Sequence, residues 1–424
     1  MTAVDDATTG TASPSRERVR AWVLVASGMF AVAWGGNEFT PLLVMYRLDH
    51  GFSQLVVDTF LFAYVLGIVP ALLIGGPLSD RLGRRPLMLP APFVAVAGSL
   101  ILATGADSAV WLIAGRILSG VALGIGMAVG GSWLKELSST EHDPTARAGA
   151  GARRAAMSLT AGFGIGAGIA GVLAQWGPWP SVFPYAVHIV IALAAGIGMW
   201  RVPETRAAVP KAERRKLSTD LKIPSAGHRR FLYVVAPVAP WVFGAAASAY
   251  AVIPALMTPH SGGAPIAFSA LLCVIGLGAG FAIQAVGRRI DTPSNARAVA
   301  VALAVLVAGM VLAAVASSAL TVPLAMIAAM MLGCGYGMAL VSGLQEIQRI
   351  AGPDDLAGLT AVFYSLSYLG FAVPAVMAAI AGTGSAITYP IMFVVGAVAA
   401  AASLVLVIVK WRAHVPEATA SERR

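Results

Sequence analysis

Two ionisable residues lie deep inside stretches that are otherwise apolar, and they are the first place where this sequence could carry chemistry. Glu38 lies in the apolar run 21–46, and Arg116 lies in the run 109–135. If both runs cross a membrane as helices, each side chain lies about 10–12 Å below the same surface, at about 1.5 Å per residue. A charged group there costs roughly 2.5–3.5 kcal/mol to insert, so it usually has a function. We predict that Glu38 and Arg116 form a proton-coupling ion pair; the alternative is a static pair that locks two helices together.

Four other polar residues lie in apolar runs or at their ends. Asp58 lies one turn into the run 54–74, where it is either a secondary proton-coupling group or an acid stabilised by the start of a helix. For His188 we expect a hydrogen bond within its own half of the protein rather than a role in proton relay. Glu346 and Arg349 are three residues apart and are expected to pair on one helix.

No feature of the sequence points to catalysis or to a bound cofactor. Cys273 and Cys334 lie in apolar runs and do not have the spacing of metal ligands. No lysine follows a glycine, which excludes the phosphate-binding sequence Gly-x-x-x-x-Gly-Lys-Ser/Thr. A nucleophile with a neighbouring base is not evident either. We therefore predict a protein that is not an enzyme and that uses no cofactor or metal.

The composition indicates a helical membrane protein. Of 424 residues, 58% are hydrophobic and only 12% are charged, whereas about a quarter of the residues in a soluble protein are charged. Apolar runs of about 20 residues recur along the chain, and each could span a bilayer as a helix. The first twenty residues are polar, so we expect no cleaved signal peptide.

Twelve membrane helices are predicted, and a long polar connection divides them into two groups of six. An even number of crossings places both termini on one side of the membrane. We assign 1–20 to an N-terminal tail, 21–201 to an N-terminal six-helix bundle, 202–229 to a linker, 230–411 to a C-terminal bundle and 412–424 to a C-terminal tail. The expected helices are 21–46, 54–74, 87–106, 109–135, 152–175, 181–201, 230–256, 265–287, 297–317, 321–348, 357–381 and 386–411.

The positive charge is distributed unevenly and predicts the orientation. The chain carries 29 Lys and Arg against 20 Asp and Glu, and all but two of the basic residues, Arg47 and Arg116, fall in the termini or in alternate connections. Basic connections stay in the cytoplasm, so we predict a multi-pass protein of the cell (inner) membrane with both termini cytoplasmic. The excess charge then faces anionic membrane lipid, and no nucleic acid is expected as a partner.

The second half of the chain repeats features of the first. A glycine-rich segment that begins at Leu123 recurs from Leu332, and the acid that follows it, Glu136, recurs as Glu346. A repeat of about half the chain predicts two pseudo-symmetric six-helix bundles with a substrate site between them.

A short charged loop joins the runs 54–74 and 87–106. Six residues there fit the pattern Gly-x-x-x-Asp-Arg-x-Gly-Arg-Arg: Gly76, Asp80, Arg81, Gly83, Arg84 and Arg85. This loop resembles the signature loop between helices 2 and 3 of the major facilitator superfamily of membrane transporters.

The resemblance implies that the loop is a conformational latch on the cytoplasmic side. It also implies that Asp80 approaches the start of helix 11 when that side is closed, where Asp354 and Asp355 could pair with a loop arginine. In the second half, Asp80 maps near Asp291. The alternative is an ordinary tight turn whose arginines only fix the orientation.

Two further segments resemble motifs of the same family. Leu112, Arg116 and Gly120 match Leu-x-x-x-Arg-x-x-x-Gly in helix 4, and in proton-coupled members this arginine is linked to proton transfer. Several drug antiporters also carry an acid in helix 1. A helix 5 motif of antiporters is matched only in part, by Gly162, Gly166 and Gly171, with Ala167 and Ala170 departing from it.

The cavity predicted from this resemblance is rich in aromatic residues and poor in amides. The whole chain has two Asn and five Gln, which disfavours a sugar because sugars need many directional hydrogen bonds. Aromatic rings and a carboxylate suit a lipophilic or cationic compound. The expected lining residues are Trp34, Asn37, Glu38, Tyr64, Trp241, Tyr250, Tyr336, Tyr364 and Tyr368.

These features together predict a secondary active transporter of the drug:proton antiporter type. It would exchange protons for small lipophilic or cationic compounds by alternating access, as a monomer in membrane lipid. The alternatives are a proton-coupled transporter of a small metabolite such as a sugar or organic acid, and a membrane sensor that does not transport.

Overall fold

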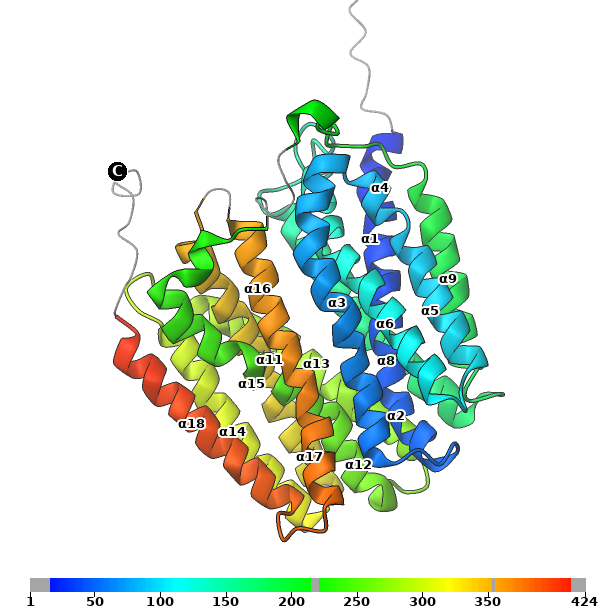
Figure 1. Cartoon of the computed structure of the whole chain (residues 1–424), viewed down its shortest axis with the longest axis vertical. Coiled ribbons are helices and arrows are strands. Elements are labelled where there is room, and N and C mark those ends of the chain that lie inside the picture. Colours follow the sequence, from blue (N-terminus) through cyan, green and yellow to red (C-terminus); the bar gives the residue numbers. More distant parts are fainter. Residues whose placement is uncertain (1–15, 215–220, 353–354, 413–424) are drawn as a thin grey trace, which may run out of the picture.

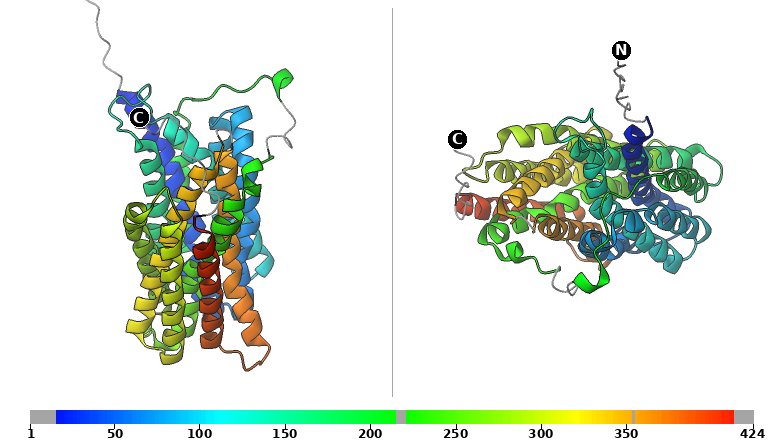
Figure 2. Two further views of the ribbon diagram at one scale, coloured as in Figure 1. Left: turned by 90° about the vertical axis from the view of Figure 1, so that its left-hand side faces the viewer. Right: turned by 90° about the horizontal axis from the view of Figure 1, so that it is seen from above.

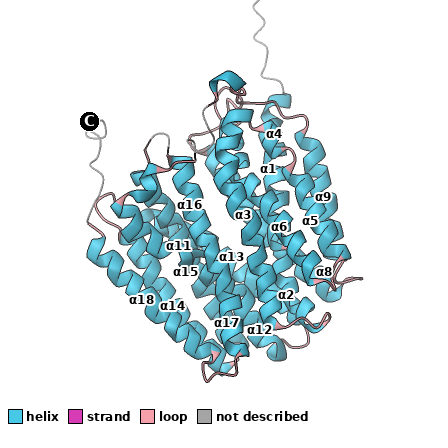
Figure 3. Ribbon diagram, in the orientation of Figure 1, coloured by secondary structure: helices cyan, strands magenta, loops and turns pink. Residues whose placement is uncertain are grey.

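The computed structural model describes residues 16–214, 221–352 and 355–412. Asp354, the predicted N-terminal tail up to residue 15 and the C-terminal tail from residue 413 lie outside these ranges. The regular secondary structure of the described residues is helical (Figure 3), apart from an isolated bridge between Thr292 and Asn295.

The described part of the N-terminal half contains nine α-helices, with a π-helical turn between α6 and α7. Their bounds are α1 Arg16–Asn37, α2 Phe39–Leu48, α3 Gln54–Leu82, α4 Arg85–Met88, α5 Ala91–Thr104, α6 Ala109–Ile125, η1 Gly126–Gly130, α7 Gly131–Glu136, α8 Ala150–Trp176 and α9 Phe183–Met199.

The C-terminal half begins after the linker and has more interruptions within its helices. The bounds are η4 Phe231–Val235, α11 Ala236–Ala247, η5 Ser248–Val252, α12 Ile253–Met257, η6 Thr258–His260, α13 Pro265–Ile290, α14 Arg297–Ala319, α15 Val322–Ile350, α16 Leu356–Tyr368, η7 Leu369–Phe371, α17 Ala372–Gly382 and α18 Tyr389–Lys410. Short helical turns in the linker are η2 Lys211–Glu213 and η3 Pro224–Gly227.

Ten helical segments of the described chain are long and apolar enough to cross a membrane, and the shorter apolar helix α9 accompanies them. The first crossing is divided into α1 and α2 at Glu38. The predicted all-α fold of two six-helix bundles is confirmed.

One helix end differs from the prediction. The second crossing was expected to end near residue 74, but α3 continues to Leu82. Asp80 and Arg81 therefore lie in the last turn of a helix, and Gly83 makes the reversal. The extension is possible because Pro77 removes only one backbone hydrogen bond, which membrane helices tolerate.

The two bundles lie side by side, and the described chain begins and ends on the same side of the molecule (Figures 1 and 2). Across the boundary, α8 packs against α13 on one face, while α3 packs against α16 and α17. One buried hydrophobic cluster crosses this boundary, because it joins Tyr64 of α3 to Tyr250, Tyr368 and Phe371 of the C-terminal half. The centre of the molecule is thus a contact between the bundles.

Helices α3 and α6 approach each other closely enough to exclude side chains. A Cβ atom on Gly67 would lie 2.0 Å from the Ile117 carbonyl oxygen, and one on Gly120 would lie 2.2 Å from the Tyr64 carbonyl oxygen. Small residues allow backbones to approach in this way. The contact fixes Tyr64 and Arg116, which extend from these two helices, relative to each other.

We predict that Gly120→Ala destabilises the protein by about 1–3 kcal/mol, because the added methyl group must push the two backbones apart. The measurement is thermal unfolding of the purified protein in detergent. Gly131→Ala is the matched control, because a Cβ there would meet no atom within 4 Å. Equal unfolding temperatures for the two variants would contradict the close contact.

Candidate functional site

The first crossing is interrupted where its ionisable residue lies. Pro41 has no amide hydrogen to donate to the carbonyl of Asn37, so the regular hydrogen-bond ladder is lost just after α1. Glu38 still donates its backbone N–H to the Trp34 carbonyl at 2.8 Å. Its side chain is fully buried inside the N-terminal bundle.

The Glu38 carboxyl group is surrounded by polar side chains from three helices. The Trp34 indole N–H donates to Oε2 at 3.1 Å, and the Ser99 hydroxyl donates to Oε1 at 3.0 Å. The same hydroxyl lies 2.7 Å from His188 Nδ1, which is itself 3.4 Å from Oε1. His188 Nε2 donates to the Ala31 carbonyl at 3.0 Å. The expected hydrogen bond of His188 within its own half is therefore present, but its neighbour is the candidate proton-coupling residue.

Arg116 does not pair with Glu38 in this structure, so the predicted ion pair is wrong here. Its guanidinium donates to the backbone carbonyls of Gly36 at 3.2 Å and Phe60 at 3.4 Å. It also lies 4.7 Å from the centre of the Phe39 ring and 4.4 Å from that of Tyr64. Arg116 instead binds the backbone of α1, while the carboxylate points toward α5 and α9.

Most of the aromatic residues predicted for the cavity lie where the bundles meet. The Tyr64 and Tyr368 ring centres are 6.2 Å apart, and Phe243 lies 4.3 Å from Tyr368 and 6.0 Å from Tyr336. Tyr250 is close to this group, with its ring centre 6.3 Å from that of Phe371. The rings pack on one another, so they fill the centre of the interface.

The other predicted cavity residues have different positions. Asn37 bridges the bundles, because its amide donates to the Phe163 carbonyl at 3.1 Å and contacts Cys273 Sγ at 3.5 Å. Tyr364 packs on Phe363, with 5.9 Å between the ring centres.

Trp241 was predicted to line the cavity, and this prediction is wrong. Its indole N–H donates to Ser403 on α18 at 3.2 Å, and α18 lies on the outer side of the C-terminal bundle (Figure 1). The ring therefore faces away from the other bundle.

Asp58 belongs to a polar group at the opposite end of the molecule from the chain termini. It is 2% exposed and accepts a hydrogen bond from Gln54 at 3.0 Å. Gln54 in turn accepts from Arg47 at 3.0 Å, and Arg47 donates to Thr258 of the other bundle at 2.7 Å. Asp58 thus lies beside a contact that joins the two bundles at this end.

The same end carries an apolar groove of about 450 Å³ between α8 and α13. Here the bundles are also linked by Gln175, whose side-chain oxygen accepts the backbone N–H groups of Ile266 and Ala267 at 2.9 and 3.2 Å. The groove is lined by Gly168, Val172, Trp176, Ser261, Ala264, Ala267, Phe268, Ala270, Leu271 and Val274.

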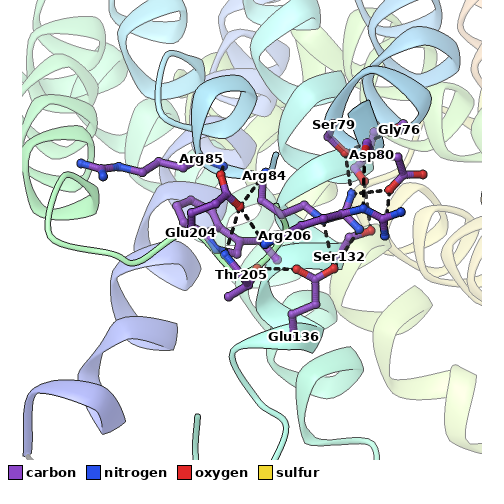
Figure 4. Close-up of polar contacts among 12 residues, drawn as sticks. Gly76, Ser79, Asp80, Arg84, Arg85, Ser132, Glu136, Glu204, Thr205 and Arg206 are labelled. Carbon is purple, nitrogen blue, oxygen red and sulfur yellow. Dashed lines mark hydrogen bonds and ion pairs between the residues drawn. The ribbon is translucent and has the colours of Figure 1, made fainter. Parts of the chain in front are cut away.

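Arg84 is the centre of the predicted latch (Figure 4). It donates to Asp80 at 2.8 Å and to Ser79 at 2.6 Å, and it contacts one oxygen of Glu136 through two nitrogens at 2.8 and 3.0 Å. Arg206 of the linker reaches Asp80 at 3.3 Å. The loop is thereby bound to helix α7 and to the linker.

Glu204, in the linker, holds the turn itself (Figure 4). Its two oxygens accept the backbone N–H groups of Arg84 and Arg85, each at 2.9 Å, at the start of α4. Gly83 has φ of 97°, and a Cβ there would lie 2.5 Å from the Glu204 carboxylate. This position therefore requires glycine for its backbone and for its space.

The predicted pairing of the loop with the start of helix 11 is not formed by the described acid there. Asp355 accepts the backbone N–H of Ser225 at 3.0 Å and its hydroxyl at 2.7 Å. The guanidinium of Arg85 donates to the Trp200 carbonyl at 2.7 Å. Gly76 and Arg81 lie on α3, where the Arg81 carbonyl accepts the N–H of Val209. Asp354 lies outside the described residues.

The C-terminal half contains a matching charge cluster. Arg349 contacts Glu346 at 2.8 Å and also contacts Asp291, while Arg230 binds Glu346 at 2.6 and 3.0 Å. The expected local pair of Glu346 and Arg349 is confirmed. In each half an arginine joins the two repeated acids, although Arg349 comes from a helix and Arg84 from a turn.

Two related bundles that meet around buried polar and aromatic groups define a membrane transporter. Residues 23–375 match the Major Facilitator Superfamily, and the chain belongs to that family.

Similar proteins include transporters of different kinds. The chain is 27% identical over 336 residues to a chloramphenicol resistance protein of Pseudomonas aeruginosa, which covers 78% of this chain and 77% of that protein. It is 36% identical over 121 residues to the glucose transporter GlcP of Staphylococcus epidermidis, which is 28% of this chain and 27% of that one. A POT family transporter, solved in complex with 5-aminolevulinic acid, has the same fold, with a TM-score of 0.74, 10% identity and coverage of 94% and 97%.

We predict that Arg84→Ala destabilises the protein by about 1–3 kcal/mol, because it leaves partly buried carboxylates without their donor. Thermal unfolding in detergent measures the effect. Arg85→Ala is the control, because its side chain makes an exposed hydrogen bond to a carbonyl, and we expect a change within about 0.5 kcal/mol. A similar loss of stability in both variants would show that the contacts of Arg84 stabilise the protein no more than the exposed hydrogen bond of Arg85.

Proposed function

We propose that this protein exports small lipophilic or cationic compounds in exchange for protons. We also propose that it lies in the cell membrane with both termini in the cytoplasm. The observation that carries the proposal is the fully buried Glu38, which lies at a helix break and has only neutral hydrogen-bond partners. A buried carboxylate without a bound cation favours uptake of a proton. Proton binding at this break can therefore be coupled to movement of the first crossing.

Arg116 links this carboxylate to the bundle interface. It binds the carbonyl of Gly36, two residues before Glu38, and it lies on the ring of Tyr64, which packs on Tyr368 of the other bundle. A shift of the α1–α2 break would move the carbonyl that holds the guanidinium. We propose that this is how the charge state of Glu38 reaches the surface where the bundles separate.

The substrate class follows from the side chains at the interface. They are aromatic, and the amide of Asn37 is already bonded. The donors that remain are tyrosine hydroxyls on rings whose surfaces suit a lipophilic molecule. The apolar groove between α8 and α13 adds a second surface that suits a lipophilic molecule. The similarity to a chloramphenicol resistance protein covers most of the chain, whereas the similarity to a glucose transporter covers about a quarter of it.

We predict that Glu38→Gln lowers proton-driven transport at least tenfold, because glutamine keeps the hydrogen bonds but cannot exchange a proton. The assay is uptake of tetraphenylphosphonium, and of glucose as a neutral comparison, into proteoliposomes with an imposed pH gradient. Asp143→Asn is the matched control: this carboxylate is also fully buried, but it lies in the connection before α8 and binds Arg154 near the start of that helix. Transport by Glu38→Gln at the rate of the control would sink the proposal.

The Arg47–Thr258 contact is proposed to close the outer side, with Asp58 beside it. We predict that Arg47→Gln shifts the population toward conformations that are open to the outside, because the hydrogen bond between the bundles is lost. Distances between spin labels on the outer ends of the two bundles would report the shift. His50→Gln, which removes an exposed hydrogen bond to Asp107 within one bundle, should leave the distances unchanged. Equal distributions in both variants would contradict this gate.

A further inference from the structure

The hydrogen-bond partners of His188 determine which of its ring nitrogens carries a proton. The Ala31 carbonyl can only accept a hydrogen bond, so His188 Nε2, at 3.0 Å, must carry a proton. A neutral imidazole has one N–H, so Nδ1 of the neutral ring presents a lone pair. This lone pair faces the Ser99 hydroxyl at 2.7 Å.

The Ser99 hydroxyl has one proton and two neighbours that require it. One neighbour is His188 Nδ1, and the other is Glu38 Oε1 at 3.0 Å. If Glu38 is ionised and His188 is neutral, the hydroxyl can serve only one of them. Two lone pairs then face each other inside a site where all three side chains are fully buried, and an unsatisfied buried acceptor is costly.

One added proton satisfies every group in either of two arrangements. In the first, Glu38 is protonated and donates to Ser99, and Ser99 donates to the neutral His188. In the second, the proton is on His188 Nδ1, which donates to Ser99, and Ser99 donates to the Glu38 carboxylate. The two arrangements interconvert when each proton moves one place along the chain of three groups.

We propose that Glu38, Ser99 and His188 form one proton-binding site that holds a single shared proton in this conformation. The proposal rests on the proposed function and extends it, since His188 becomes part of the coupling site and Ser99 the bridge within it. Because the three side chains have no exposed surface, the proton is occluded here. Its release requires α1, α5 and α9 to separate or the α1–α2 break to move.

The ionisable groups that face this site come from the surrounding helices. Arg116 of α6 contributes a positive charge, and the hydroxyls of Tyr46 and Tyr185, from α2 and α9, are bonded to each other at 2.8 Å. Tyr64 of α3 lies against Arg116. The guanidinium therefore remains as a compensating charge when the shared proton leaves.

The test is a direct titration of the purified protein in lipid, without any transport. Infrared spectroscopy follows the carboxylic acid band of Glu38, identified by its loss in Glu38→Gln, as the pH is raised. In His188→Gln the side-chain amide can donate to Ser99, so the ionised carboxylate is satisfied without the extra proton. We expect the pH at which half of the band is lost to fall by at least about one unit, a tenfold change in proton affinity.

The control is His50→Gln, which also removes a histidine bonded to a carboxylate and should leave the band unchanged. If His188→Gln does not fold, solid-state NMR of 15N-histidine in Glu38→Gln replaces it: one ring nitrogen should lose its titration over this pH range. An unchanged Glu38 band in His188→Gln, or unchanged histidine titration in Glu38→Gln, would overturn the shared site. If these changes in titration are observed but the protein shows no proton-driven transport, the proposed function is overturned and the shared site is not.

Discussion

The central constraint in this structure is the burial of the Glu38 carboxyl group at the junction between α1 and α2. Pro41 prevents the first crossing from continuing as one regular helix, and Glu38 lies at the resulting junction with no exposed surface. Neutral donors from α1 and α5 hold it, and a histidine from α9 completes the group. Because the charge of such a group is costly inside a membrane protein, we propose that its protonation and the position of the junction depend on each other.

The two bundles resist separation through different contacts at the centre and at the ends. Aromatic rings of α3, α11 and α16 fill the centre, and Arg47 and Gln175 join the bundles at the end away from the termini. At the other end, the clusters around Arg84 and Arg349 are formed within each half. The two halves thus contain similar charge clusters, in each of which an arginine joins two acids of the same half.

Much of this could be predicted from the sequence. Glu38 and Arg116 could be recognised because a charged residue in an apolar run is rare. The internal repeat also showed that Glu346 corresponds to Glu136 and that Asp291 corresponds to Asp80. Depth along a helix does not give the direction in which a side chain points, so the Glu38–Arg116 pair and the cavity position of Trp241 were wrong. The contact of His188 with Ser99 and Glu38 could not be predicted for the same reason. The hydrogen bonds of Glu204 to the turn at Arg84 and Arg85 could not be predicted either, because they join segments that are far apart in the sequence.

We propose that movement of substrate requires movement of a proton through Glu38. The most direct measurement records internal pH and tetraphenylphosphonium together in one population of proteoliposomes, with only a substrate gradient imposed. We expect protons to move in the opposite direction to the cation, at a constant ratio to it. Movement of the cation with no change in internal pH would contradict it.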